Sequence, residues 1–317
     1  MAAKRVPRIG ISGWRYKPWR GTFYPEDLAQ KRELEYASRQ LNSIEINGSF
    51  YSLQRPSSWK SWYEQTPEDF VFSIKGSRYI THMRKLKDVG EPLANFFSQG
   101  LLALGEKLGP ILWQFPPNFR FDAEKIEAFF EMLPRDTQEA ARLGKKHTAF
   151  MNGRTFFEAH ANHPLRHAME IRHDSFKCPE FIALLRKHDV ALVVADTAGK
   201  WPFLEDLTSD FVYARLHGDE QLYTSGYTPE ALDKWAGRVN AWLAGREPPD
   251  AAHASEKPAK KRKQRDVFIY FDNDVKVRAP FDAMGLAQRT GGYVPEHPPL
   301  EPPAHLPHEA RDHWPIT

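Results

Sequence analysis

The sequence has 317 residues, 41% of them hydrophobic and 13% aromatic, which is the composition of a globular protein with a sizeable buried core. No apolar run approaches the ~20 residues that a membrane-spanning helix needs, and the single cysteine, Cys178, excludes an internal disulfide and a cysteine-based zinc site. The net charge is +3, but residues 256–265 contribute +5 of it (six basic residues and one glutamate), which leaves −2 for the rest of the chain.

This distribution does not predict attraction of nucleic acid over the whole surface. The N-terminal residues Met1–Arg8 are basic and lack the apolar region of a signal peptide. We therefore expect a cytoplasmic protein with no membrane partner.

Eight segments have the composition of β-strands. Most of them alternate apolar with polar residues, as Met169-Glu170-Ile171-Arg172 does. In chain order, the predicted strands are Arg8–Trp14, Asn42–Asn47, Phe70–Lys75, Pro110–Phe115, Ala168–Asp174, Ala191–Asp196, Phe211–His217 and Val267–Asp272.

Helix-like stretches separate most of these strands. They are Asp27–Leu41, Leu93–Leu108, Asp122–Leu133, Pro179–His188, Thr228–Leu243 and Phe281–Arg289, and a Trp-rich segment, Ser57–Gln65, precedes the third strand. Apart from its helix, the long connection between the fourth and fifth strands is predicted to be irregular and basic.

Strands that alternate with helices in this way predict an α/β fold, a (β/α)₈ TIM-type barrel, formed as a single domain by residues 1–290. The alternative is a doubly wound open sheet, but no Gly-x-Gly-x-x-Gly turn follows the first strand. Residues 247–265, rich in Pro, Ala, Lys and Arg, predict a flexible basic insertion. Residues 291–317 form a Pro/His-rich C-terminal tail.

If the more apolar side of each strand faces the helices, the other side faces the barrel axis. By this rule, we expect twenty side chains to face the barrel axis. They are Ser12, Trp14, Ser43, Glu45, Asn47, Val71, Ser73, Lys75, Leu112, Gln114, Glu170, Arg172, Val194, Asp196, Tyr213, Arg215, His217, Phe268, Tyr270 and Asp272. The charged members come late in their strands, so they converge at the C-terminal end, where barrel active sites form. Burying such charges unpaired is costly. They therefore pair with one another, hold water or bind a ligand.

Several of these segments also resemble the domain-of-unknown-function 72 family, the YecE-like proteins. The similar segments are Ile9–Tyr16, Ser43–Tyr51, Phe72–His82, Leu112–Pro117, Glu170–Phe176, Ala195–Thr197 and Tyr270–Asn273. The resemblance covers nearly the whole chain and implies a TIM-type barrel, but the family has no established activity. Its barrel is similar in outline to endonuclease-IV-like barrels, which suggests nucleic-acid repair by analogy alone.

Our first hypothesis is an enzyme, a hydrolase, isomerase or lyase, that acts by acid–base chemistry on a small ligand bearing a phosphate or carboxylate. Glu45 or Glu170 is the candidate general base and His217 the general acid, with Asp272 as a further catalytic candidate. Cationic side chains hold such anions, and aromatic ones pack against the rest of a ligand. The predicted ligand-binding residues are Trp14, Arg15, Tyr16, Asn47, Tyr51, Lys75, Arg78, His82, Gln114, Arg172, Asp196 and Arg215.

Two alternatives remain open. In the first, a divalent metal bound by Glu45, Glu170, Asp196, His217 and Asp272 assists phosphodiester hydrolysis, although the sequence requires no cofactor and contains no His-Glu-x-x-His motif. In the second, the pocket binds a metabolite or a nucleic-acid end without catalysis, with aromatic loop residues stacking on it.

Overall fold

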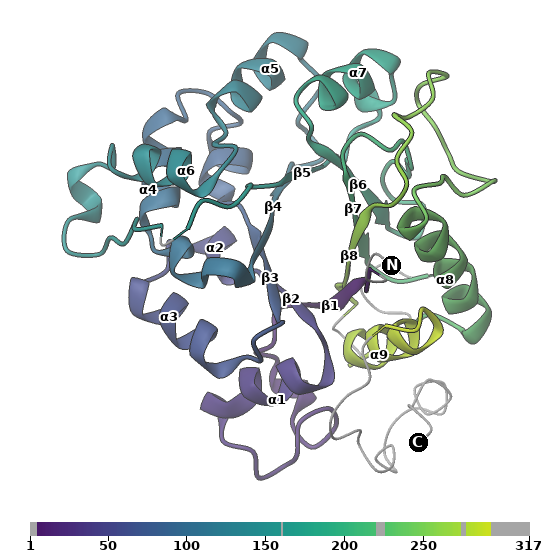
Figure 1. Cartoon of the computed structure of the whole chain (residues 1–317), viewed down its shortest axis with the longest axis horizontal. Helices are drawn as coiled ribbons and strands as arrows, with labels where there is room; N and C mark the ends of the chain where they lie inside the picture. The colour runs from purple at the N-terminus through teal and green to yellow at the C-terminus, as the bar shows by residue number, and fades with distance from the viewer. Residues whose placement is uncertain (1–4, 160, 220–225, 274–276, 293–317) are drawn as a thin grey trace.

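A closed ring of parallel strands forms the centre of the molecule (Figure 1). The structure, a computed structural model, describes residues 5–159, 161–219, 226–273 and 277–292. Each strand pairs with the next along the chain, and the last pairs with the first. The strands are β1 (Arg8–Ser12), β2 (Ser43–Ile46), β3 (Val71–Lys75), β4 (Leu108–Gln114), β5 (His167–Glu170), β6 (Ala191–Asp196), β7 (Phe211–Leu216) and β8 (Asp266–Phe271). The predicted TIM-type barrel is confirmed.

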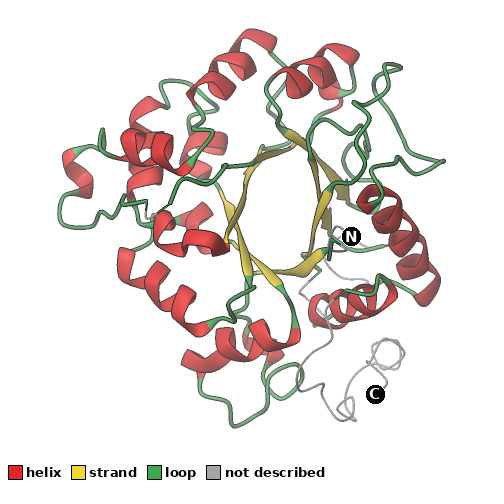
Figure 2. Cartoon of the chain, viewed as in Figure 1, coloured by secondary structure: helices red, strands yellow, loops and turns green. Residues whose placement is uncertain are grey.

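Helices surround the strand ring on its outer side (Figure 2). They are α1 (Glu33–Gln40), α2 (Gly48–Tyr51), α3 (Pro56–Gln65), α4 (Gly90–Ser98), α5 (Ala123–Met132), α6 (Thr137–Gly144), α7 (Pro179–Lys187), α8 (Pro229–Leu243) and α9 (Ala279–Arg289). Short 3₁₀ turns occupy Lys17–Trp19, Gln30–Arg32, Leu101–Lys107, Ala149–Met151 and Asp174–Phe176, and a π-helical turn occupies Tyr79–Met83.

Two helix predictions differ from the structure. The segment predicted to be irregular contains α6, whose first turn is capped by the Asp136 carboxylate, which accepts a hydrogen bond from the Glu139 N–H at 2.7 Å. The predicted helix Leu93–Leu108 is interrupted at Gly100, where φ is +112°, a conformation that favours glycine. The chain then continues as a 3₁₀ turn and enters β4 at Leu108.

The barrel interior is filled by small and aromatic side chains: Leu112, Ala168, Ala191, Val193, Ala195, Phe211, Tyr213, Phe268 and Tyr270. This list confirms the predicted facing of β4, β7 and β8. The predicted facing of β6 is wrong, because its alanines point inward while Val194 packs in the outer core between sheet and helices. Both sides of β6 are apolar, so the hydrophobic pattern does not distinguish them.

Trp14 was also predicted to face the axis, and it does not. β1 ends at Ser12, and Gly13 has φ of +84°, so the strand alternation stops before Trp14. The Trp14 ring packs edge-to-face on Trp62 of α3, with 5.4 Å between ring centroids.

The basic insertion, residues 247–265, connects α8 to β8 and therefore lies at the N-terminal end of the strands. The Asp206 carboxylate accepts hydrogen bonds from the backbone N–H groups of Ala254 and Ser255, at 2.7 and 3.2 Å. Buried Arg265 donates to the carbonyls of Ser209 and Gly245. These bonds join the insertion to the barrel. Residues 293–317 of the predicted tail lie outside the described residues.

Among the described helices, none is long and apolar enough to cross a membrane.

The turn after β3 provides a test of barrel packing. A Cβ atom at Gly76 would lie 2.3 Å from Cε3 of the buried Trp113 ring, whereas a Cβ atom at Gly90 meets no atom within 4 Å. We predict that Gly76→Ala lowers the free energy of unfolding by roughly 1–3 kcal/mol through overpacking. The control Gly90→Ala should cause no loss. Urea titration followed by tryptophan fluorescence measures both, and equal midpoints for the two variants would contradict the prediction.

Candidate functional site

The guanidinium of Arg215, on β7, lies at the centre of the site and is fully buried. Its Nη1 donates to Glu170 Oε2 at 2.8 Å, and its Nη2 donates to Asp272 Oδ2 at 2.8 Å. Its Nε and Nη2 donate to the two carboxylate oxygens of Glu45, both at 3.0 Å. One cation therefore holds three carboxylates from three other strands or their ends.

Glu45 is tied into the barrel interior by further bonds. Its Oε1 accepts from Ser12 Oγ at 2.8 Å, and its Oε2 accepts from Tyr213 OH at 2.6 Å. The Tyr213 hydroxyl also lies 2.7 Å from Ser73 Oγ. Both carboxylate oxygens of Glu45 therefore have partners, and the side chain has no exposed surface.

Glu170 is saturated in the same way. Its Oε1 accepts from Gln114 Nε2 and Arg172 Nε, both at 2.9 Å, while Oε2 is bonded to Arg215. Burial raises the pKa of Glu170, but the charges of Arg172 and Arg215 lower it more, so that its pKa lies well below the usual range. A carboxylate held in this way is a poor proton acceptor.

His217 lies beside the same guanidinium. Its Nε2 is 3.2 Å from Arg215 Nη1, and its Nδ1 is 3.1 Å from Asp272 Oδ2. Burial and the Arg215 charge lower the pKa of His217, so the imidazole is neutral at pH 7. Neutral His217 can accept from Arg215 at Nε2 and donate to Asp272 at Nδ1, which orients both partners.

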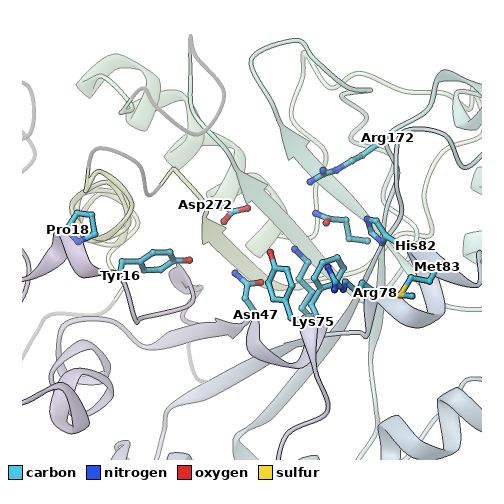
Figure 3. A pocket seen from close by; sticks show the side chains of 12 residues that line it. Tyr16, Pro18, Asn47, Lys75, Arg78, His82, Met83, Arg172 and Asp272 are labelled. Carbon is cyan, nitrogen blue, oxygen red and sulfur yellow. The ribbon is translucent and has the colours of Figure 1, made fainter.

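A cavity of about 960 Å³ opens above this network, at the C-terminal ends of the strands. Figure 3 shows the side chains around it, with Asp272 and Arg172 across from Lys75 and Arg78 in this view. The lining residues are Tyr16, Pro18, Asn47, Phe50, Tyr51, Lys75, Arg78, His82, Met83, Gln114, Arg172 and Asp272.

The structure thus brings together nine of the residues that the sequence analysis assigned to the site. They are Tyr16, Asn47, Tyr51, Lys75, Arg78, His82, Gln114, Arg172 and Asp272. Glu45, Glu170, Arg215 and His217 lie buried beneath the cavity and are not among its lining residues. The acid–base roles that we assigned to Glu45, Glu170 and His217 are therefore not supported by direct access to a ligand.

Cationic groups dominate the lining. Arg78 is exposed and lies over the Tyr51 ring at 5.5 Å, and Arg172 stacks on the Trp201 ring at 3.8 Å. Lys75 is largely buried, with its Nζ 4.5 Å from the centre of the Phe50 ring. Among the lining residues that the structure describes, Asp272 is the only carboxylate, and it is bonded to Arg215.

Two lining residues have pKa values that differ markedly from those of free side chains. Burial, together with the charges of Arg172 and Lys75, lowers the pKa of His82 to about 4, so this imidazole is neutral at pH 7. Burial raises the pKa of Asp272, but the Arg215 charge and the His217 hydrogen bond lower it more, and the net pKa is below its usual range. Asp272 is therefore an ionised carboxylate at the cavity wall.

Asp196 and Arg15 lie outside this cavity. The Asp196 carboxylate accepts a hydrogen bond from Tyr227 OH at 2.9 Å and lines a separate cavity of about 390 Å³. Burial raises the pKa of Asp196 to about 6. This placement follows from the facing of β6 described above. Arg15 is exposed and is not among the residues that line the cavity.

The proposed metal ligands do not form a ligand set. Three of the carboxylates surround the Arg215 guanidinium, which takes the position that a cation would need, and Asp196 bonds elsewhere. Within the described part of the chain, no group of three or more His, Cys, Asp or Glu side chains is arranged to hold a metal ion.

Phe50, one of the aromatic loop residues considered for stacking on a bound ligand, lines the cavity. Sequence reasoning did not include Pro18 and Met83 in the site, and it assigned no role to Trp201, which stacks on Arg172. The backbone N–H of Gly76, directly after β3, donates to the Leu112 carbonyl at 2.8 Å.

A closed parallel barrel with a charged cavity at the C-terminal ends of its strands defines a TIM-barrel protein with a candidate ligand site. The chain belongs to the family described as "Protein of unknown function DUF72", which it matches over residues 8–306. The resemblance drawn from the sequence motifs is thereby confirmed.

Two curated relatives belong to the same group of uncharacterised proteins. The chain is 28% identical over 123 residues to the UPF0759 protein YunF of Bacillus subtilis (strain 168), and the matched stretch covers 37% of this chain and 43% of YunF. It is 29% identical over 111 residues to the UPF0759 protein YecE of Escherichia coli (strain K12), and the matched stretch covers 35% of this chain and 38% of YecE. The matched stretches span less than half the length of these relatives.

Two solved structures share the fold. A DUF72 family protein from Thermotoga maritima MSB8 superposes with a TM-score of 0.67 at 23% identity, covering 89% of this chain and 98% of that one. A DUF72 family protein from Enterococcus faecalis V583 superposes with a TM-score of 0.64 at 16% identity, covering 93% of this chain and 99% of that one. At these identities the similarity shows the fold alone.

The buried ion network makes a prediction about stability and pH. Arg215→Met leaves buried carboxylates without their cation, and we predict a loss of about 3–5 kcal/mol in the free energy of unfolding at pH 7. Burial without Arg215 raises the folded-state pKa of Glu170 and Asp272, so the folded variant binds more protons than the unfolded chain. Its stability should therefore rise as the pH falls from 7 to 5, while the stability of the unsubstituted protein changes little.

Urea unfolding at several pH values measures both effects. Arg32→Met is the matched control, because Arg32 is exposed and pairs only with Glu35 at the surface. An Arg215→Met variant that unfolds at the same urea concentration as the unsubstituted protein at pH 7 would show that the network is not needed for stability.

Proposed function

We propose that this protein is an enzyme that binds a small phosphate- or carboxylate-bearing substrate in the cavity at the C-terminal face of the barrel and transforms it by acid–base chemistry. The observation that carries the proposal is the imbalance of charge in the lining. Lys75, Arg78 and Arg172 face the cavity, against one carboxylate in the described lining, Asp272, which is bonded to Arg215.

The shape and walls of the cavity agree with a small substrate. Its volume of about 960 Å³ is at the upper end of the ~300–1,000 Å³ of small-molecule sites. Phe50, Tyr51 and Tyr16 provide apolar and aromatic surface, and the arginine side chains can form paired hydrogen bonds with phosphate or carboxylate oxygens.

Acid–base candidates are the groups at the wall rather than the buried ones. Lys75, His82 and Asp272 line the cavity and have shifted pKa values. Glu45, Glu170 and His217 act in this proposal by positioning Arg215, Arg172 and Asp272.

A nucleic-acid ligand receives less support. The basic tract lies at the N-terminal end of the strands, opposite the cavity, so it does not extend the cationic lining into a continuous surface. The protein could also bind the same anionic ligand without transforming it. A screen for turnover of candidate substrates distinguishes this alternative from the proposal.

Inorganic phosphate is the first probe of the anion site. We predict that Arg78→Gln weakens phosphate binding by roughly ten-fold or more, because a charge-assisted hydrogen bond contributes about 1.5–3 kcal/mol. Arg32→Gln, at an exposed arginine that is not among the lining residues of the cavity, should bind phosphate like the unsubstituted protein. Isothermal titration calorimetry at low salt measures all three affinities. Equal phosphate affinity in Arg78→Gln and the unsubstituted protein, or no binding to either, would contradict the anion site.

A further inference from the structure

Lys75 differs from the other buried lysine of the described chain in having no hydrogen-bonding partner. Lys107, 3% exposed, donates its ammonium protons to the carbonyls of Tyr63 and Thr66 at 2.7 and 2.8 Å and to Thr66 Oγ1 at 3.3 Å. Lys75 is 7% exposed, yet among the described residues its Nζ has neither a hydrogen bond nor an ion pair. The Lys75 side chain lines the cavity, so its nitrogen is open to a ligand.

The environment of Lys75 favours the neutral amine. Burial, and after it the charge of Arg215, lowers the pKa of Lys75 to about 8. At pH 8 about half of the side chain is then unprotonated, compared with roughly 0.3–0.4% of an ordinary lysine. An unprotonated lysine in a partly apolar site next to another cation is a nucleophile.

The position of the amine is well defined by the fold. Lys75 is the last residue of β3, and its carbonyl accepts a hydrogen bond from Ser49 Oγ at 2.7 Å. Gly76 follows and packs directly against the Trp113 ring. The side chain therefore projects from a rigid strand end into the cavity, beside the Phe50 ring and on the same wall as Arg78.

We propose that Lys75 forms a Schiff base with the aldehyde or ketone carbonyl of a small substrate that also carries a phosphate or carboxylate. The anionic group is held by Arg78 and Arg172, which places the carbonyl near the Lys75 amine. This inference rests on the proposed function, since the anion site supplies the orientation, and it narrows the substrate class to anionic carbonyl compounds.

The step is balanced without an oxidant or a cofactor. The unprotonated Nζ adds to the carbonyl carbon, a C–N bond forms, and the carbonyl oxygen takes up a proton to give a carbinolamine. The hydroxyl group then leaves as water, the nitrogen loses its second proton, and an imine remains. Protonation of the imine nitrogen gives an iminium, which withdraws electrons from the adjacent carbon and so favours proton removal or bond cleavage there.

Pyridoxal 5′-phosphate, an aldehyde that carries a phosphate, is a direct probe. The full-length protein is mixed with one equivalent at pH 8, reduced with borohydride to make the adduct permanent, digested and analysed by mass spectrometry. We expect Lys75 to be modified about ten-fold or more in excess over an exposed lysine such as Lys125, because of its larger neutral fraction. Inorganic phosphate should suppress the Lys75 adduct.

The matched variant is Lys75→Arg, which keeps the positive charge but has no condensing amine. It should lose the adduct, whereas Lys125→Arg should keep the adduct at Lys75. Phosphate binding without a Lys75 adduct would overturn the Schiff-base proposal and leave the anion site standing. Absence of both phosphate binding and adduct would overturn both proposals.

The pH dependence gives a second readout. The yield of Lys75 adduct within a short fixed time should rise from pH 6.5 to 9.5 with a midpoint near 8. The charged groups that act on Lys75 are Arg215 on β7, Glu45 on β2, Glu170 on β5, Asp272 after β8 and, near the rim, His82. A yield of Lys75 adduct that does not level off by pH 9.5 would overturn the proposal.

Discussion

The contact between Arg215 and three carboxylates is the constraint on which the rest of this site depends. Removing a guanidinium and several carboxylates from water is tolerated only when nearly every donor and acceptor finds a partner. Here the carboxylates come from the ends of β2, β5 and β8, while the guanidinium comes from β7. A register shift of one residue in any of these strands would turn its charge out of the barrel, so the network specifies the register.

The same network determines the electrostatics of the cavity above it. Between them, Arg215 and Arg172 have Glu45, Glu170 and Asp272 as ion-pair partners, and these contacts fix the two guanidinium groups below and beside the cavity. Arg78 and Arg172 are then stabilised by aromatic rings, Tyr51 and Trp201. Among the lining residues that the structure describes, three are cationic and one is a carboxylate, a local excess of positive charge that the net charge of the chain does not reveal.

Strands with a clear alternation of apolar and polar residues could be read correctly from the sequence. Glu45 in β2 and Arg215 in β7 face inward as predicted, because their neighbours along the strand are strongly apolar. The pattern fails at Asp196, since both sides of β6 are apolar, and at Trp14, because the backbone turns at Gly13. Pairing is a matter of three-dimensional contact. A list of inward charges therefore does not show that Glu170 accepts hydrogen bonds from three donors, nor that Lys75 Nζ finds no acceptor among the described residues.

Arg215 and the carboxylates have opposite effects on Lys75, and together they suit a Schiff base better than a permanent ammonium. Burial and Arg215 favour the neutral amine, while Glu45, Asp272 and Glu170 favour a positive charge at the same nitrogen. The first effect makes the amine nucleophilic before condensation. Once an iminium has formed, its positive charge occupies the place of the ammonium, where the three carboxylates stabilise it. Because the iminium carries a substrate carbon instead of exchangeable protons, it needs fewer hydrogen-bond acceptors than an ammonium does. The lack of acceptors around Lys75 in the described chain is therefore less costly in the condensed state than in the free one.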